Sequence, residues 1–206
     1  VLPDSAAIGM CDLGPTGQFA VAPNAVNGDQ IRFILKSTGP TCVAPVMTAA
    51  ASKKVHGTAG TFSIDLLAAG ATECRKNGAT TVEVTFDRAI ALVTGTPADV
   101  AVTSGSVTAV AAAGSVLTVT CSGMTNNAKT TMTFPGVADG QTGCSAFVSP
   151  SSLCIRNIKG DSASGFGAVN VIDLNAIKNQ VNIVVTGSNF RCDVDATGKI
   201  NVLDLN

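Results

Sequence analysis

The stretch Val82-Glu83-Val84-Thr85-Phe86-Asp87 alternates apolar and polar side chains at every step. Successive side chains of an extended chain point to opposite faces, so Val82, Val84 and Phe86 share one face. An alternation of this kind is typical of a strand that is buried on one side only. The stretch therefore predicts a strand of an antiparallel sheet with one face on a core.

The same period of two recurs on both sides of this stretch, at residues 62–66, 99–103, 107–111, 115–121 and 130–134. Glycine, proline, asparagine and serine cluster between these runs. Short strands with turn signals at a spacing of roughly 8–15 residues are typical of a β-sandwich. We therefore predict a mainly β fold, an antiparallel, Ig-like β-sandwich over residues 46–155, without a helix before residue 170. Its expected core consists of Phe62, Ile64, Leu66, Val82, Val84, Phe86, Val116, Val119, Met132 and Phe134.

Residues 1–45 form a separate N-terminal β segment in this interpretation, with strand-like runs at 18–22 and 30–36. The segment belongs either to the sandwich or to a contact between subunits. Its first residues read like a mature N-terminus from which an export signal has been removed. No run of about 18 apolar residues occurs, so we expect no membrane span.

The composition excludes several classes of function. Only 13% of the 206 residues are charged, about half the usual share, and the net charge is −1. A nucleic-acid-binding surface needs clustered Lys and Arg, which this chain lacks. Because His56 is the single histidine, a zinc site with several histidines is excluded as well.

Seven cysteines and no C-x-x-C pair indicate disulfides in an oxidising compartment rather than zinc or thiol redox chemistry. Buried free thiols are the alternative. Six pairing cysteines allow about 15 connectivities, so the pairs remain open. We favour Cys144–Cys154, which closes a short loop, followed by Cys11–Cys42 and Cys74–Cys121. Cys192 is then left over, either to bond between chains or to pair with Cys154.

The pattern changes after residue 153. Leu174, Ile177 and Val181 follow helical spacing and predict a helix over residues 171–181. Residues 160–175 and 192–206 also share the pattern G-x-[VI]-N-V-[IL]-D-L-N. A match of this length indicates a duplicated module.

The second copy places oxygen-bearing side chains in the register of a calcium-binding loop. Such loops use positions 1, 3, 5, 7, 9 and 12, with glycine at position 6. Gly198 is at position 6, and Lys199 at position 7 offers its backbone carbonyl. The expected ligands are Asp193, Asp195, Thr197, Lys199, Asn201 and Asp204.

The first copy is one residue too long for this register, because counting back from Asp173 puts Phe166 at position 5. The loop is therefore either bulged around a cation or empty. Its candidate ligands are Asp161, Ser164, Asn170 and Asp173.

The aspartate at position 12 and the V-N-x-x-D endings resemble type I dockerin modules. The resemblance implies a small, helical, EF-hand-like calcium module over residues 156–206 that attaches to partner proteins. The sequence reaches Asn206 where the second recognition helix would begin, so we expect that helix to be truncated. A second resemblance is to a sandwich domain that precedes dockerin repeats in large secreted bacterial proteins. It covers the stretches 51–57, 60–66, 73–75 and 82–86. This second resemblance implies an extracellular or cell-surface location and no activity.

No catalytic constellation is evident, and we predict that the chain is not an enzyme. His56 is either a general base or a structural histidine in a turn, and the absence of a nucleophile elbow favours the second reading. Asp65, Glu83 and Asp87 belong to alternating strands and are expected to face solvent rather than form a glycosidase pair.

We predict an extracellular structural or assembly protein, a cell-surface or filament subunit that contacts other chains or copies of itself. The alternative is a carbohydrate-binding or scaffold-attachment module of a secreted polysaccharide-degrading system, although a chain without Trp or Tyr offers few aromatic platforms.

Overall fold

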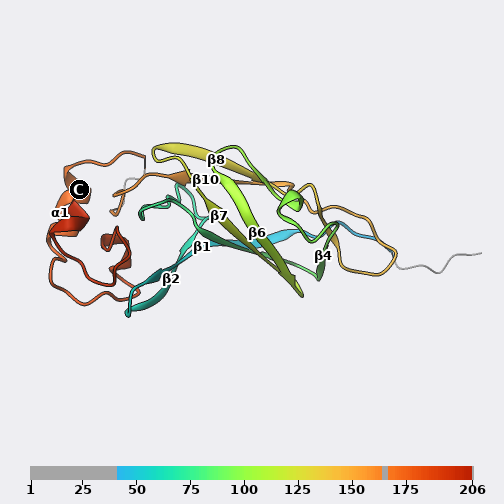
Figure 1. Ribbon diagram of the computed structural model, residues 1–206, viewed down its shortest axis with the longest axis horizontal. Helices are drawn as coiled ribbons and strands as arrows, with labels where there is room; N and C mark the ends of the chain where they lie inside the picture. Colours follow the sequence, from blue (N-terminus) through green and yellow to red (C-terminus); the bar gives the residue numbers. More distant parts are fainter. Residues whose placement is uncertain (1–40, 164–166, 206) are drawn as a thin grey trace, which may run out of the picture. The chain divides into compact units, whose positions relative to one another are not determined.

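The computed structural model describes residues 41–163 and 167–205. They belong to one compact unit, Pro40–Asn206, which includes residues on both sides of the boundary expected at 155/156. The unit is mainly β, and every ladder between its named strands is antiparallel (Figure 1). The strands expected at 18–22 and 30–36, and Cys11, lie outside the described residues.

The largest sheet contains five strands in the order β2-β1-β3-β7-β6. Its centre is β3, which pairs Val82 with Ser52 on one side and with Val119 on the other. The bounds are β1 (Met47–His56), β2 (Gly60–Asp65), β3 (Thr81–Phe86), β6 (Ser106–Ala113) and β7 (Val116–Ser122).

Two smaller sheets complete the β part. The first has the order β10-β8-β5, with β5 (Ala101–Val102), β8 (Ala128–Thr133) and β10 (Ser152–Asn157). The second pairs β4 (Ile90–Leu92) with β9 (Val137–Asp139). We did not predict β1, β4, β9 and β10 as strands, because they are very short or lack a clear apolar alternation.

One hydrophobic core joins the five-stranded sheet to the three-stranded sheet. Val82, Val84 and Phe86 of β3 are buried as their alternation predicts, and Met132 and Ile155 of the smaller sheet lie in the same cluster. The core therefore lies between strands of two antiparallel sheets.

Two expected core residues behave differently. On β7 the buried side chain is Leu117, not Val116, since Leu117 and Val119 are two apart and share a face. Phe62 is only half-buried and packs against a second, C-terminal cluster. The expected strand at 99–103 was also partly wrong, because residues up to Asp99 form a 3-10 turn, η1 (Pro97–Asp99), before β5 begins.

The C-terminal part contains one α-helix among the described residues, α1 (Val171–Lys178), and two 3-10 turns, η2 (Phe190–Cys192) and η3 (Val202–Leu205). The helix buries Asp173 and Ile177, whereas Leu174, which we expected on the buried face, is exposed. A small second core holds this part together. Its buried members are Ile177, Val185, Cys192, Val194 and Ile200, and Ala59 and Phe62 of the β1–β2 hairpin pack against it.

The disulfide pairing that we favoured was wrong. Cys42 bonds to Cys144, which rules out Cys144–Cys154 and Cys11–Cys42. The segment around Pro45 pairs with Ser149, which donates its N–H to the Pro45 carbonyl at 2.8 Å. This pairing brings the segments that carry Cys42 and Cys144 together.

The other described cysteines carry free thiols. Cys74, Cys121 and Cys192 are buried and Cys154 is exposed on β10, so the expected pair Cys74–Cys121 does not form either. Burial raises the pKa of Cys74 to about 12 and that of Cys121 to about 11.

Candidate metal centre

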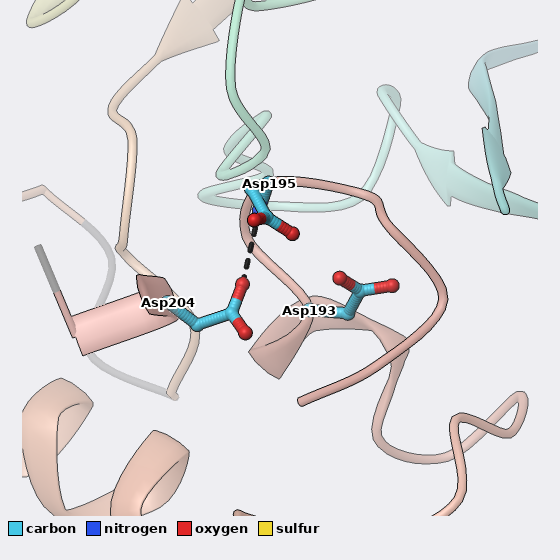
Figure 2. A group of neighbouring side chains, drawn as sticks. All are labelled: Asp193, Asp195 and Asp204. Carbon is cyan, nitrogen blue, oxygen red and sulfur yellow. Dashed lines mark hydrogen bonds between the residues drawn. The ribbon is translucent and has the colours of Figure 1, made fainter. Parts of the chain in front are cut away.

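The structure brings together three of the predicted ligands of the second loop. Carboxylate oxygens of Asp193, Asp195 and Asp204 lie within 4.8 Å of one another, and Figure 2 shows the three side chains around a common space. Asp193 follows η2 directly, and Asp204 lies on η3. Asp193 and Asp204 are buried, while Asp195 is half-buried.

Backbone N–H groups of the loop hold two of these carboxylates in place. Asp193 accepts hydrogen bonds from Thr197 at 3.1 Å and from Gly198 at 2.8 Å. Asp204 accepts from Asp195 at 3.1 Å and from Asn201 at 2.9 Å. The loop is therefore wrapped around its acidic ends, and the positive φ of +86° at Gly198 allows the turn.

The remaining predicted ligands of this loop divide into two groups. The Lys199 carbonyl lies 3.5 Å from the Thr197 hydroxyl and 3.4 Å from the Asn201 amide nitrogen, so positions 5, 7 and 9 are neighbours. The side-chain oxygen Oδ1 of Asn201, however, accepts the Leu203 N–H at 2.8 Å. Asn201 thus caps η3, a role that the register of the loop did not reveal.

The electrostatics of the loop favour a cation. Burial raises the pKa of Asp204, and the charges of Asp195 and Asp193 raise it further, while its backbone hydrogen bonds act in the opposite direction. A bound divalent cation would relieve this repulsion. Because the predicted donors are all oxygens, the set fits a hard cation such as calcium.

The first loop repeats the same hydrogen-bond frame. Asp173 accepts from Ala163 at 2.9 Å and from Asn170 at 3.0 Å, as Asp204 does from its counterparts. Asp161 accepts from Gly167 at 3.1 Å, as Asp193 does from Gly198. The two segments are therefore repeats in structure as well as in sequence.

The first loop differs from the second in its donor set. Ala163 stands where the second loop has Asp195, and the side-chain oxygen Oδ1 of Asn170 accepts the Ile172 N–H at 2.7 Å as the cap of α1. Ser164, the other candidate, lies outside the described residues. The buried Asp161 keeps one carboxylate oxygen without a hydrogen-bond partner among the described residues. Fewer of the predicted ligands thus converge here than in the second loop.

A buried polar network that sequence reasoning missed adjoins the second loop. His56, the last residue of β1, is fully buried, and its Nδ1 lies 2.8 Å from an Asp193 oxygen. Burial lowers the pKa of His56, and the charges of Arg75 and Lys54 lower it further, whereas Asp193 opposes them. The expected structural histidine is therefore a partner of a predicted metal ligand, and nothing in the sequence spacing linked residues 137 positions apart.

The centre of this network is a buried ion pair. Arg75 donates two hydrogen bonds to Glu73, at 2.8 and 2.7 Å, and both side chains are inaccessible to solvent. Burial alone would raise the pKa of Glu73, but the hydrogen bonds and charge of Arg75, with a hydrogen bond from Ser52, lower it overall. The pair was not a candidate in the sequence because it lies outside any predicted strand.

Comparison with models of protein families, with curated proteins and with solved structures found no match to this chain. Among the described residues, no helix has both the length and the apolar character needed to cross a membrane. The function proposed below rests on the chain's own residues and geometry.

Proposed function

We propose that this chain is a non-catalytic extracellular protein of the structural or assembly type. In this proposal the five-stranded and three-stranded sheets form an Ig-like β-sandwich, and residues 156–206 form a dockerin-like calcium module that contacts other protein chains. The observation that carries the proposal is the convergence of Asp193, Asp195 and Asp204, at positions 1, 3 and 12 of the second repeat. Calcium would stiffen the loop, because carboxylates that repel one another become ligands of a single cation.

Exposed apolar side chains support the role in protein contacts. Each repeat ends in N-V-[IL]-D-L-N, in which the aspartate is buried and the two apolar residues before it are exposed. Val171 and Ile172 are 65% and 59% exposed, and Val202 and Leu203 are 66% and 62% exposed. Grouped apolar side chains on a surface mark contact sites. The Cys42–Cys144 disulfide is consistent with an oxidising, extracellular compartment.

Isothermal titration of the full chain with calcium tests the metal site. We expect uptake of calcium by the native protein and its loss in Asp204→Asn, which removes one ligand charge without changing the shape of the side chain. Asp65→Asn, an exposed aspartate on β2, is the matched control and should bind as the native chain does. A native chain that takes up no calcium contradicts the proposed site.

Sedimentation analysis, with calcium and with chelator, tests the assembly role. We expect self-association or capture of a secreted protein partner that weakens in Val202→Ser/Leu203→Ser. Val93→Ser, at an exposed valine outside the repeats, should leave association unchanged. A strict monomer without a protein partner under both conditions contradicts the assembly role, and binding on a glycan array would instead support the carbohydrate-binding alternative.

A further inference from the structure

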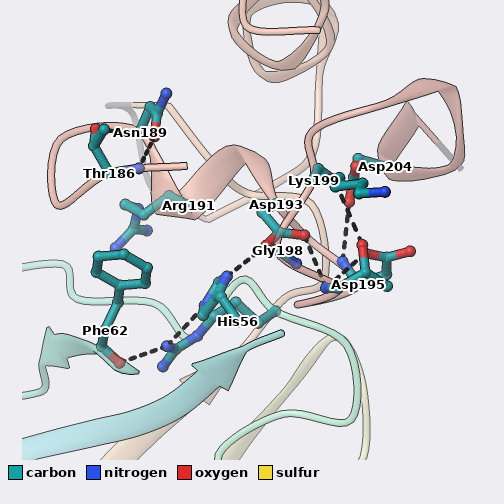
Figure 3. A network of polar contacts seen from close by, with 12 residues as sticks. His56, Phe62, Thr186, Asn189, Arg191, Asp193, Asp195, Gly198, Lys199 and Asp204 are labelled. Atoms are coloured by element: carbon teal, nitrogen blue, oxygen red, sulfur yellow. Dashed lines mark hydrogen bonds and ion pairs between the residues drawn. The ribbon is translucent and has the colours of Figure 1, made fainter. Parts of the chain in front are cut away.

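The β1–β2 hairpin meets the second loop through a buried hydrogen bond between side chains. His56 Nδ1 lies 2.8 Å from Asp193 Oδ2, and both side chains are completely buried. The same Asp193 oxygen accepts the Gly198 N–H at 2.8 Å, a chain of contacts that Figure 3 shows. A residue of the sheet therefore helps to orient the first ligand of the loop.

The surroundings of His56 determine which ring nitrogen carries the proton. Its Nε2 faces Arg75 Nη1 at 3.5 Å, and a guanidinium can only donate. Nε2 is therefore the acceptor, and Nδ1 bears the hydrogen that points at Asp193. Arg75 is itself held, because it donates to the carbonyls of Phe62 at 2.9 Å and Ser52 at 2.8 Å.

The backbones of the hairpin and the loop also touch. A Cβ added at Gly57 would lie 2.1 Å from the Thr197 carbonyl oxygen, and one added at Gly198 would lie 2.6 Å from the His56 carbonyl oxygen. Both glycines have positive φ, +47° and +86°. The two backbone segments are therefore in direct contact, with no room for a side chain at either glycine.

A second layer of contacts surrounds the hydrogen bond. Phe190 of η2 stacks on Phe62 of β2, with ring centroids 5.2 Å apart, and His56 meets both rings edge-on. Lys76 donates its N–H to the Val194 carbonyl at 2.6 Å, one residue after Asp193. The loop is thus anchored on both sides of its first ligand.

We infer that His56 is a positioning residue for the calcium loop, and that calcium binding therefore stabilises the β1–β2 hairpin as well as the loop. The inference rests on the calcium site proposed above. Outer hydrogen-bond partners fix the orientation of metal ligands, and a cation that binds only the folded arrangement stabilises every element which that arrangement requires. The sheet and the loop accordingly respond to calcium as one unit.

Hydrogen–deuterium exchange of the full chain, with calcium and with chelator, tests the coupling without any substitution. We expect calcium to slow amide exchange in residues 47–65 together with residues 192–205. The Asp204→Asn variant should show neither change. Protection confined to residues 192–205 would overturn the coupling.

Two substitutions test the role of His56 itself. His56→Leu removes the donor, and we expect the calcium Kd to rise about tenfold. His56→Asn places an amide N–H at the position of Nδ1, and its Kd should lie nearer to that of the native chain. Val84→Ala, in the core of the sheet, should lower the unfolding temperature equally with and without calcium and leave the Kd unchanged.

The outcomes separate the two proposals. Calcium uptake with an unchanged Kd and an unchanged calcium-dependent thermal shift in His56→Leu would overturn the positioning role alone. Absence of uptake by the native chain would overturn the calcium site, and this inference with it.

Discussion

Arg75 shows at the scale of a residue how this chain accommodates a buried charge. A buried guanidinium is tolerated only if its donors find acceptors, and Arg75 reaches the Glu73 carboxylate and the carbonyls of Ser52 and Phe62. Its charged centre also lies 5.7 Å from the centre of the Phe190 ring. One side chain therefore joins β1, β2 and η2.

Arg75→Met should destabilise the protein strongly, because it leaves the Glu73 carboxylate buried without its counter-charge. Loss of one partner of a buried ion pair costs about 3–5 kcal/mol. Chemical denaturation of both proteins measures the free energy of unfolding. Lys53→Met is the matched control, because Lys53 pairs with Glu83 at 2.6 Å at the partly exposed surface, where such a pair contributes at most about 1 kcal/mol. Equal losses in the two variants would show that Arg75 does not support the fold in this way.

At the scale of an element, the β1–β2 hairpin supports the candidate metal loop, because His56 and Gly57 contact it. Its strands pair from Ala51↔Asp65 to His56↔Gly60, so the turn begins at the residue that contacts Asp193. Gly57 in this turn must adopt a left-handed φ and must also leave room for the Thr197 carbonyl. Alternation predicts β2 well, but β1 carries Ser52 and His56 on its buried face and therefore does not look amphipathic.

Gly57→Ala should lower the free energy of unfolding by more than the conformational effect alone. An alanine at positive φ costs about 1–2 kcal/mol, and overpacking against the Thr197 carbonyl adds about 1–3 kcal/mol. Gly95→Ala isolates the first part, because Gly95 has a φ of +67° with no atom within 4 Å of an added Cβ. Thermal or urea unfolding compares the two. If the variants lose the same stability, the hairpin is not packed against the loop as described.

At the scale of the whole molecule, a disulfide in the described part of the chain joins the segment before β1 to the loop between β9 and β10. The Cys42–Cys144 bond spans a sequence separation of 102 residues, far more than the ten-residue loop that we favoured. Closing a long loop restricts the unfolded chain more than closing a short one. The bond therefore acts on the sheets as a whole rather than on a local turn.

Cys42→Ser/Cys144→Ser should lower the free energy of unfolding by about 2–5 kcal/mol, as loss of a native disulfide usually does. Cys154→Ser, at an exposed free thiol, should change it by no more than about 0.5 kcal/mol. Denaturation without reductant measures both. A double variant as stable as the native chain would contradict the structural role of the bond.

Patterns among residues that are close in sequence account for most of what could be predicted from the sequence. Val82, Val84 and Phe86 are buried on one face of β3 as their alternation implies, because the side-chain period of a strand depends on neighbouring residues only. The start of α1 at Val171 and the repeated loop frame follow equally local signals, namely helical spacing and a duplicated motif. The convergence of Asp193, Asp195 and Asp204 belongs to this group, since all three lie within twelve residues.

Contacts between distant segments were decided only by the tertiary structure. The partner of Cys42, the contact of His56 with Asp193 and the hydrogen bonds of Arg75 to the carbonyls of Ser52 and Phe62 all depend on how the sheets and the loops pack. The antiparallel strands and the acidic repeat could be predicted from the sequence alone, because periodicity and ligand register act over a few residues. Which cysteines bond and what supports the candidate metal loop depend on the tertiary structure, because folding brings together residues as distant in sequence as His56 and Asp193, 137 positions apart, and no local pattern encodes that proximity.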